Sequence, residues 1–381
     1  MIKTICRITL LTVFCAHLVA CSGMFDTDNT PKPSELKSIN TEFTPRKLWS
    51  TSVGKNGNTW LRQTPAFHNN VLYTMNERGD VYAVNAENGT HLWSTALTGK
   101  FAAGPTAFQD TVIVASRTGH IYALSAANGK IKWEQDIKSE VLANPALNED
   151  VVVIKTTDGQ LRAFNAATGA KRFNFKQNEP NLILYGASKP HFQHNHLYVG
   201  FANGNLIKLN AETGKIMWLR PVAVPEGAFA IERMIDIDAD PAPASNRVFA
   251  ASYQGNIAAF DAKEGRTLWT HAISSYTGMT TDDDGLYITD ASGVLWAFDA
   301  RTGSERYRQT ELTARGLSAP ASFGQHVIVG DRLGFVHWFN KQNGRIVARM
   351  GLGSAILATP LVENNRLYVL TQNGHLSAYQ L

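Results

Sequence analysis

Apolar and polar positions recur along the chain in one unit, of which GHIYALSAANGKIKW, Gly119 to Trp133, is a regular copy. The eight copies begin at Gly79, Gly119, Gly159, Gly204, Gly255, Gly293, Gly334 and Gly374. The second residue after this glycine is always aliphatic and the fifth is always apolar, so both faces of the segment are apolar. This pattern predicts a short strand that is buried on both sides.

A polar turn such as SAANG follows, and its closing glycine comes ten residues after the first glycine. Such a turn reverses the chain, because glycine adopts the left-handed conformation without a Cβ clash. A bulky residue then stands at a fixed offset, and only Ala348 departs from it. These bulky residues are Trp93, Trp133, Phe173, Trp218, Trp269 and Tyr307. The pattern predicts a hairpin that leads into a further strand.

Upstream of each first glycine lies another apolar run, and a proline precedes the glycine by fourteen residues in seven of the eight copies. Each unit therefore has four short strands, and proline suits the start of the first, where its missing N–H is least needed. Units of about forty residues with four strands each are typical of β-propellers. The sequence predicts an all-β, eight-bladed β-propeller with four antiparallel strands per blade.

The two ends of the repeat region complement each other. The last copy stops at Leu381, before any turn or bulky outer strand, whereas an unpaired bulky strand around Trp49 precedes the first unit. We expect this N-terminal strand to complete the last blade, since pairing would remove a free sheet edge. The predicted propeller covers residues 47–381.

The first twenty residues have a basic front, Lys3 and Arg7, and then an uncharged apolar run, which predicts an export signal over residues 1–20. The signal ends in LVAC, Leu18 to Cys21, which resembles a bacterial lipobox. The resemblance implies lipidation of Cys21, and Ser22 after it favours sorting to the outer membrane. The alternative is an ordinary secretory signal with a chance cysteine. Residues 21–46, rich in polar residues and proline, are expected to form a flexible tether.

Charge and cysteine content narrow the classes of partner. The net charge is +4, and removal of the signal leaves 34 basic and 32 acidic residues, a balance of +2. No basic stripe with interleaved aromatic residues occurs, so we expect no nucleic-acid partner. All three cysteines, Cys6, Cys15 and Cys21, lie in or directly after the signal, so the mature chain has no pair for a disulfide.

Departures from the regular spacing locate two insertions at consecutive blade junctions. Pro190 comes seventeen residues after Phe173, and Pro241 comes twenty-three residues after Trp218. Both segments combine apolar side chains with charge, as a protein-binding loop would. The residues that we single out are Leu182, Leu184, Tyr185, Phe229, Ile231, Arg233 and Met234. The alternative is that these side chains plug the ring locally.

The sequence contains no complete motif for catalysis or metal binding. His194 and His196 could share a strand face, but no third metal ligand is evident, so a polar turn explains them and we expect no metal. The sequence contains no GxSxG, HExxH or phosphate loop, the signatures of common catalytic sites. We therefore expect a protein that is not an enzyme.

The repeat element AxxGxxxW, as in AANGKIKW, resembles that of quinoprotein (PQQ) dehydrogenases, which are also eight-bladed. This resemblance implies an alternative function as a PQQ-dependent propeller enzyme. That family has an adjacent pair of cysteines at the quinone, whereas this chain has no cysteine after Cys21. The chain is also short for such an enzyme.

The chain as a whole resembles the BamB family of outer-membrane assembly lipoproteins, and the resemblance is specific in ERMIDIDADP and in GDRLGFVHWFN, Gly330 to Asn340. It implies a periplasm-facing, lipid-anchored scaffold without a cofactor that helps to insert β-barrel proteins into the outer membrane. The implied partners are the POTRA region of a BamA-type subunit and the other lipoproteins of the BAM complex. Unfolded outer-membrane proteins are a further candidate partner.

The same resemblance implies which residues contact the BamA-type subunit. The family's LSLRG-type loop matches Leu182, Leu184 and Tyr185, and its DVD-type aspartate pair matches Asp236 and Asp238. Tyr185 stands where the family has arginine, so a hydroxyl or aromatic contact would replace an ion pair there. Both matched segments fall within the two insertions.

Overall fold

The computed structural model describes residues 29–55, 63–282 and 285–380 of the 381-residue chain. The chain divides into two units, Met1–Pro33 and Ser34–Leu381. In the first unit, the described residues 29–33 are exposed and have no regular secondary structure. The predicted export signal and Cys21 lie outside the described residues. No helix in the described part is both long enough and apolar enough to span a membrane.

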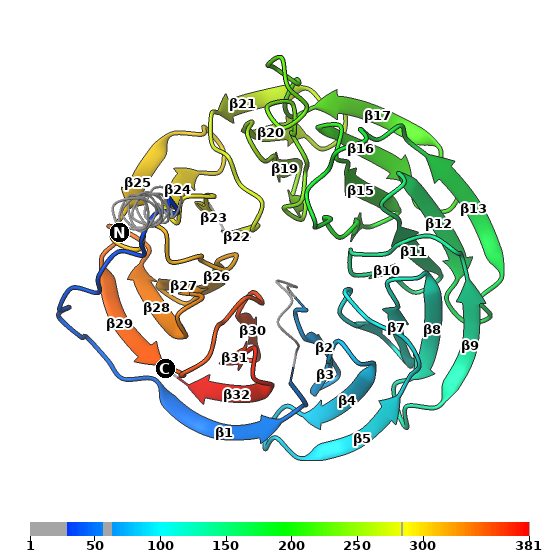
Figure 1. Ribbon diagram of the computed structural model, residues 1–381, viewed down its shortest axis with the longest axis horizontal. Helices are drawn as coiled ribbons and strands as arrows, with labels where there is room; N and C mark the ends of the chain where they lie inside the picture. The colour runs from blue at the N-terminus through cyan, green and yellow to red at the C-terminus, as the bar shows by residue number, and fades with distance from the viewer. Residues whose placement is uncertain (1–28, 56–62, 283–284, 381) are drawn as a thin grey trace, which may run out of the picture. The chain divides into compact units, whose positions relative to one another are not determined.

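The second unit is a ring of eight four-stranded antiparallel sheets, the blades of a β-propeller (Figure 1), as predicted. From the innermost strand outward, the first four blades are β2 (Ala66–His68), β3 (Val71–Met75), β4 (Asp80–Asn85), β5 (His91–Ala96); β6 (Thr106–Phe108), β7 (Thr111–Ala115), β8 (His120–Ser125), β9 (Ile131–Asp136); β10 (Ala146–Leu147), β11 (Val151–Lys155), β12 (Gln160–Asn165), β13 (Lys171–Lys176); β14 (His191–Gln193), β15 (His196–Gly200), β16 (Asn205–Asn210) and β17 (Ile216–Pro221).

The remaining four blades, in the same order, are β18 (Ala242–Ala244), β19 (Arg247–Ala251), β20 (Ile257–Asp261), β21 (Thr267–His271); β22 (Met279–Asp282), β23 (Gly285–Thr289), β24 (Leu295–Asp299), β25 (Glu305–Gln309); β26 (Ala321–Phe323), β27 (His326–Gly330), β28 (Phe335–Asn340), β29 (Ile346–Gly351); β30 (Leu361–Glu363), β31 (Arg366–Leu370), β32 (His375–Gln380) and β1 (Arg46–Ser52).

The ring closes in blade eight, where β1 pairs antiparallel with β32 and Trp49 lies opposite Ala378. The prediction that the N-terminal strand completes the last blade is therefore confirmed. The pairing leaves blade eight with four strands, like every other blade. Closure thus depends on the two ends of the repeat region meeting in one sheet.

Burial follows the position of a strand within its blade. The second strand of blade three, β11, is buried at every residue, whereas the outermost strand, β13, alternates between exposed and half-buried residues. The inner strands are buried on both faces because each blade stacks against its two neighbours. The core is accordingly a series of apolar layers between blades.

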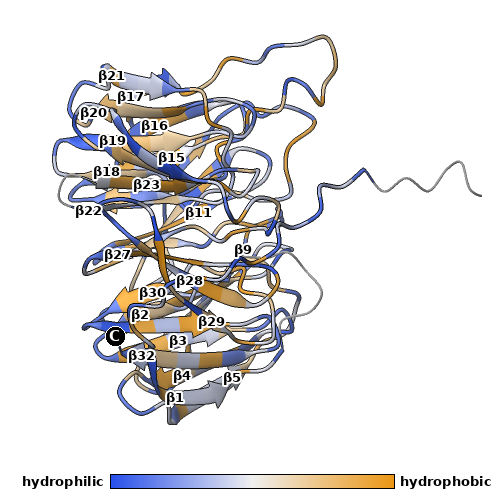
Figure 2. Ribbon diagram, turned by 90° about the vertical axis from the view of Figure 1, so that its left-hand side faces the viewer, coloured by the Kyte–Doolittle hydropathy of each residue, from blue (hydrophilic) through white to orange (hydrophobic). Residues whose placement is uncertain are grey.

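Chain direction assigns each connection to one of two faces of the ring. The turns between second and third strands and the connections from one blade to the next emerge together, and we call this side the loop face. The other turns emerge on the opposite face. In Figure 2 the longest loops extend from one side of the ring. The two predicted insertions, residues 177–190 and 222–241, belong to the loop face.

Residues 34–43, which we name the strap, lie against blades six to eight. The Ser34 amide donates to the Thr313 carbonyl at 3.0 Å, and the Glu42 amide donates to the Val347 carbonyl at 2.9 Å. Phe43 packs on the core between blades seven and eight. This part of the expected flexible tether over residues 21–46 is thus bound to the propeller, because its apolar side chains pack against the apolar core of blades six to eight.

Candidate protein-interaction surface

The two long loops of the loop face are joined by alternate aspartates of the segment DIDAD, Asp236 to Asp240. Asp236 Oδ1 accepts a hydrogen bond from the Leu184 amide at 2.8 Å, and Asp240 Oδ1 accepts one from the Lys189 amide at 2.7 Å. Between them, Asp238 lies so close to Gly186 that a Cβ on this glycine would come within 2.7 Å of Oδ2. Residues 184–189 are therefore held along the second loop as one unit.

Asp236 is a buried brace of this unit and has only 1% of its surface exposed. Its second oxygen, Oδ2, is buried without a hydrogen-bond partner among the described residues. Burial raises the pKa of this carboxyl, against the opposing effects of the Leu184 amide and the Lys155 ammonium. A hydrogen bond to a charged group contributes about 1.5–3 kcal/mol. Asp236 thus fixes the position of the Leu184 backbone from the buried side of the loop.

A buried lysine lies beneath the loops. Lys155 Nζ donates to the Gly200 carbonyl at 2.6 Å and lies 5.4 Å from the centre of the Phe201 ring. Burial lowers the pKa of Lys155, whereas the negative charges of Glu179 and the three aspartates raise it. A buried charge requires paired partners of this kind. Lys155 therefore joins blade three to blade four by its hydrogen bond, and the carboxylates of both loops favour its charged form.

Glu179, one of these carboxylates, lies at the start of the first loop. Its carboxylate accepts hydrogen bonds from the amides of Ala202, at 3.2 Å, and Asn203, at 3.0 Å. Burial raises the pKa of Glu179, and the Lys155 charge opposes this effect. The first loop is in this way attached at its beginning to the turn between β15 and β16.

Tyr185 reaches from the first loop to blade two. The Arg117 guanidinium lies 5.2 Å from the centre of the Tyr185 ring and forms an ion pair of 2.9 Å with Glu140. Such a contact is a cation–π interaction, worth about 0.5–1 kcal/mol at an exposed site. Tyr185 thus packs on Arg117 within the chain, and 54% of the residue remains exposed to solvent.

A second exposed apolar group lies on the loop over residues 222–241. Its members Val224, Phe229 and Ile231 are exposed by 60% or more. The Glu232 carboxylate accepts hydrogen bonds from the amides of Ala228, at 2.8 Å, and Phe229, at 3.0 Å, and so closes a tight turn. Phe229 is thereby presented to solvent by an ordered turn, as an anchor for a partner would be.

The structure separates the predicted contact residues into two groups. Leu182, Tyr185 and Arg233 are exposed, and Leu184 and Asp238 are half-buried. Met234 and Asp236, by contrast, are buried in the free chain, where they support the loop from within. Plugging of the ring, the alternative for the loops, does not describe Leu182, Phe229 or Ile231, which are exposed.

An axial cavity of about 470 Å³ opens beside the loops and is lined by residues from the connections at all eight blade junctions. Leu184, Tyr185 and Gly186 form part of its wall. Its charged lining is balanced, with two basic and two acidic side chains: Lys189, Arg332, Asp238 and Asp240. The first loop therefore borders both the outer surface and the centre of the ring.

Some residues that support the two loops could not be identified from the sequence. Arg117 lies in the turn between β7 and β8, Glu140 lies in the connection from blade two to blade three, and nothing in their spacing connects them to Tyr185. Lys155 did carry a signal, since it is a charged residue within the otherwise apolar run VVVIK. Val224 carried a weaker signal, because it is an apolar residue in a loop.

Comparison with known proteins places these features in context. The family model described as "Outer membrane protein assembly factor BamB" matches residues 36–108, 77–309 and 308–381. A relative of that name from Legionella pneumophila (strain Paris) is 43% identical over 374 residues, which covers 97% of this chain and 97% of the relative. The similarity thus includes both long loops.

Solved structures support the same relationship. The crystal structure of BamB from Moraxella catarrhalis has a TM-score of 0.81 and 26% identity, and the match covers 89% of this chain and all of that one. The quinohemoprotein alcohol dehydrogenase from Comamonas testosteroni has a TM-score of 0.71 at 13% identity, covering 88% of this chain and 76% of that chain. The likeness to the dehydrogenase is one of fold alone.

Proposed function

The chain belongs to the family of outer membrane protein assembly factor BamB, and on that basis we propose how it serves the assembly of outer membrane proteins. It acts as a non-catalytic scaffold whose loop face binds the POTRA region of a BamA-type subunit. By holding that subunit and the other lipoproteins of the BAM complex in position, it assists insertion of β-barrel proteins into the outer membrane. Unfolded substrate proteins are a further candidate partner.

The observation that carries this proposal is the braced pair of loops. Asp236 and Asp240 hold the backbone of Leu184 and Lys189, so the first loop is ordered before a partner arrives. Preorganised loops lose little conformational entropy on binding, which favours affinity. Leu182, Tyr185 and Phe229 supply the exposed apolar contacts, and Asp238 and Arg233 supply polar ones at the edge.

The proposed location is the periplasmic side of the outer membrane, with Cys21 as the lipidated anchor. Its support is the LVAC motif after the export signal. Two or more acyl chains would make such an anchor stable. A shift in the mass of the mature protein when lipoprotein processing is blocked tests the role of Cys21.

The scaffold proposal is preferred over the PQQ-dependent enzyme for a specific reason. Similarity to the quinoprotein enzymes extends to the fold alone, at 13% identity for the Comamonas protein, whereas the BamB protein of Legionella pneumophila is 43% identical along nearly the whole chain. Reconstitution with PQQ and calcium followed by a dye-reduction assay tests the enzyme directly, and activity would overturn our choice.

Co-purification from detergent-solubilised membranes tests the scaffold. We expect the wild-type chain to capture the barrel-insertion subunit and the double variant L182A/Y185A to capture at least tenfold less, because exposed apolar anchors dominate binding energies. The matched control is I131A, since Ile131 is 49% exposed, similar to Leu182 at 45%, but lies on the outer strand β9.

Each result of this experiment has a clear meaning. Equal loss in L182A/Y185A and I131A would show a general effect of surface truncation and refute the loops as the site. If the wild-type chain captures no such subunit, the scaffold proposal fails altogether.

A further inference from the structure

Bulky residues of the outer strands form a latch between each blade and the next. The Trp133 indole N–H donates to the Ala166 carbonyl at 2.9 Å, and the ring lies over Gly169, where a Cβ would come within 2.7 Å of it. The same arrangement joins the rings of Trp49, Trp93, Phe173, Trp218, Trp269 and Tyr307 to Gly89, Gly129, Gly214, Gly265, Gly303 and Gly344. Seven of the eight seams thus use a ring placed over the turn between third and fourth strands.

The seam between blades seven and eight cannot use this latch. The fourth strand of blade eight is β1, which comes from the other end of the chain, so no turn joins it to β32. The sequence changes accordingly, because Ala348 occupies the position of the bulky residue on β29 and Trp338 lies opposite it on β28. The other blades have the bulky residue on the outer strand, as in the pair Trp133 and Ala123.

The strap fills the seam that lacks the latch. Phe43 packs beside Trp338, with 6.2 Å between the ring centres in an edge-to-face arrangement, and beside His326 at 4.9 Å. Leu36 and Ile39 pack on the core shared by blades six and seven. As a result, the first three residues of β29, Ile346–Ala348, are buried, unlike the outer strand β9.

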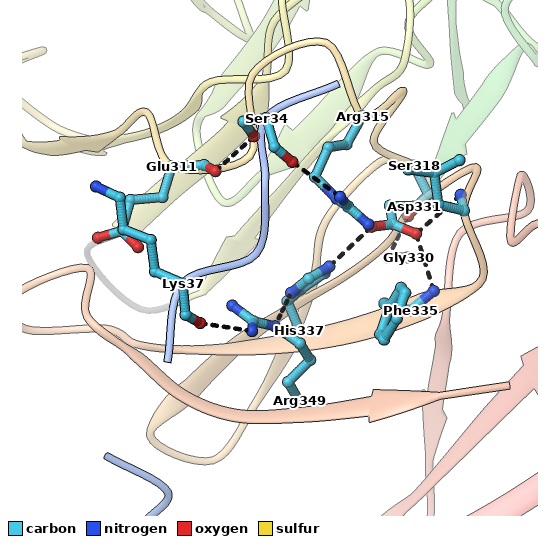
Figure 3. Close-up of polar contacts among 11 residues, drawn as sticks. Ser34, Lys37, Glu311, Arg315, Ser318, Gly330, Asp331, Phe335, His337 and Arg349 are labelled. Carbon is cyan, nitrogen blue, oxygen red and sulfur yellow. Dashed lines mark hydrogen bonds and ion pairs between the residues drawn. The ribbon is translucent and has the colours of Figure 1, made fainter. Parts of the chain in front are cut away.

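A buried polar network holds the backbone of the strap (Figure 3). Arg315 donates through Nε to Asp331 at 2.7 Å and through a terminal nitrogen to the Ser34 carbonyl at 3.0 Å. Arg349 likewise donates to the Lys37 carbonyl at 2.9 Å. Arg315 and Asp331 are almost fully buried, at 4% and 0% exposure. The two guanidinium groups therefore present fixed donors to two carbonyls of the strap.

His337 links the two arginines. Its Nδ1 accepts from Arg349 Nε at 3.3 Å, so its Nε2 carries the hydrogen that is donated to Asp331 at 3.0 Å. Asp331 and His337 both belong to the segment Gly330–Asn340 that the sequence marked as specific. That segment thus forms, with Arg315 and Arg349, a binding site for the strap.

The strap runs from one face of the ring to the other. Ser34 also donates through its hydroxyl to the Glu311 carbonyl at 2.7 Å, in the connection between β25 and β26, which lies on the loop face. Glu42 lies beside Val347, near the start of β29 at the opposite face. Ser34, the first residue of the propeller unit, is therefore on the same face as the candidate interaction surface.

We propose that the blade-seven site docks the strap so that Ser34, where the chain enters the propeller unit, is fixed on the loop face. Attachment of the strap and binding of a partner to Leu182, Tyr185 and Phe229 then involve the same face of the ring. The identity of that face as the partner-binding face rests on the proposed function. The docking of the strap does not depend on any partner.

Proteolysis of the full chain tests whether the strap is docked. Endoproteinase Lys-C cleaves after Lys37, whose carbonyl is held by Arg349. We expect R349M to be cleaved there about tenfold faster or more than wild type, since a hydrogen bond to a charged group is lost. S34P, which removes the amide donor and the hydroxyl of Ser34, should have a similar effect without altering the blade. The control is R301Q, because Arg301 is exposed and contributes only backbone contacts.

Spin labels test the position of the strap in a full chain with Cys6, Cys15 and Cys21 replaced by serine. One label is placed at Glu35, an exposed residue of the strap, and the second at Leu333, on the loop face, or at Gln342, on the opposite face. We expect a narrow distance distribution that is shorter to Leu333 than to Gln342, and at least a twofold broader one in R349M.

Two outcomes would overturn the proposal. One is cleavage after Lys37 at the same rate in wild type, R349M and S34P. The other is a distribution from Glu35 that is equally broad, or no shorter to Leu333, in the wild-type chain. Since no partner is present in either assay, such a failure is distinguishable from failure of the scaffold function.

Discussion

The Leu184 amide donates a 2.8 Å hydrogen bond to the carboxylate of Asp236, a residue 52 positions later in the chain. This contact joins the loops after blades three and four into one rigid unit. Asp236 therefore differs in role from the exposed Leu182, although both were predicted as contact residues. A variant can distinguish a residue that braces the loop from one that contacts the partner, because only loss of a bracing residue changes the stability and hydrogen exchange of the free protein.

We expect D236A to lower the free energy of unfolding by about 1–3 kcal/mol, because the Leu184 amide loses its partner. Hydrogen exchange over residues 182–190 should also accelerate. Urea unfolding and exchange mass spectrometry measure these effects. E226A, at an exposed position of the same loop, should stay within about 0.5 kcal/mol of wild type. Loss of partner capture with stability and exchange unchanged would instead show that Asp236 touches the partner.

For Tyr185, the cation–π contact with Arg117 requires the ring and not the hydroxyl. We expect Y185F to exchange at residues 182–187 like wild type, and Y185R to exchange faster because a second cation faces Arg117. The change in unfolding free energy of Y185R should be below about 1 kcal/mol, since the site is exposed. If Y185R rigidified this stretch, Glu140 rather than the ring would be the main partner at this site.

The ring latch makes Gly169 sensitive to any side chain. Its φ is +71° and a Cβ would lie 2.7 Å from Trp133, so we expect G169A to lower the unfolding free energy by about 2–4 kcal/mol. Gly324 is the control, with φ +54° and no atom within 4 Å of an added Cβ. G324A should cost only the backbone strain, about 1–2 kcal/mol. Equal urea midpoints for both variants would argue against the latch.

In blade seven the positions of the bulky residue and the alanine are exchanged, as Trp338 and Ala348, and we expect that exchanging them back does not restore stability. W338A removes a fully buried side chain and should cost about 3–5 kcal/mol. The swap W338A/A348W restores the arrangement of the other blades, yet it should recover less than about 0.5 kcal/mol of that loss, since blade eight lacks the receiving turn. Chemical denaturation measures all three proteins, A348W included. Recovery close to wild type would mean that local volume alone sets this pair.

His337 predicts a dependence of stability on pH. Burial lowers its pKa from 6.5, and the charges of Arg349 and Arg315 act in the same direction, whereas Asp331 opposes them. As pH falls below 6.5, the unfolded chain binds a proton that the folded chain does not, so stability decreases until the lowered pKa is reached. Unfolding between pH 8 and 5 should show a steeper loss in wild type than in H337Q. Equal slopes would show that His337 ionises freely in the fold.

The ring could be predicted because its determinants are local and repeated. Glycine at turns with positive φ, proline before the inner strands and a ring beside each turn recur at fixed spacings, and eight such units have one way to bury both faces. The two insertions were found with the same spacings. Their braces were not, because Asp236 and Leu184, or Arg117 and Tyr185, meet only once the blades are assembled.

The sequence shows which residues depart from the repeat, but it does not show why they do so. Lys208 replaces the usual alanine, and the structure shows its ammonium donating to the Ala262 carbonyl of the next blade at 2.7 Å. Ala348 replaces the bulky residue because the adjoining blade has no turn to receive one. Both causes are properties of a neighbouring blade, and a single repeat does not contain them.

Pairing of β1 with β32 has a consequence for the order of folding. The first propeller strand to leave the ribosome finds its partner only when the last strand has followed, so blade eight forms after the others. Contacts between such distant segments slow the final step. A nascent or prematurely terminated chain keeps an unpaired β1 edge, which proteases and chaperones can recognise. The ring thus becomes stable only after its last strand has been synthesised.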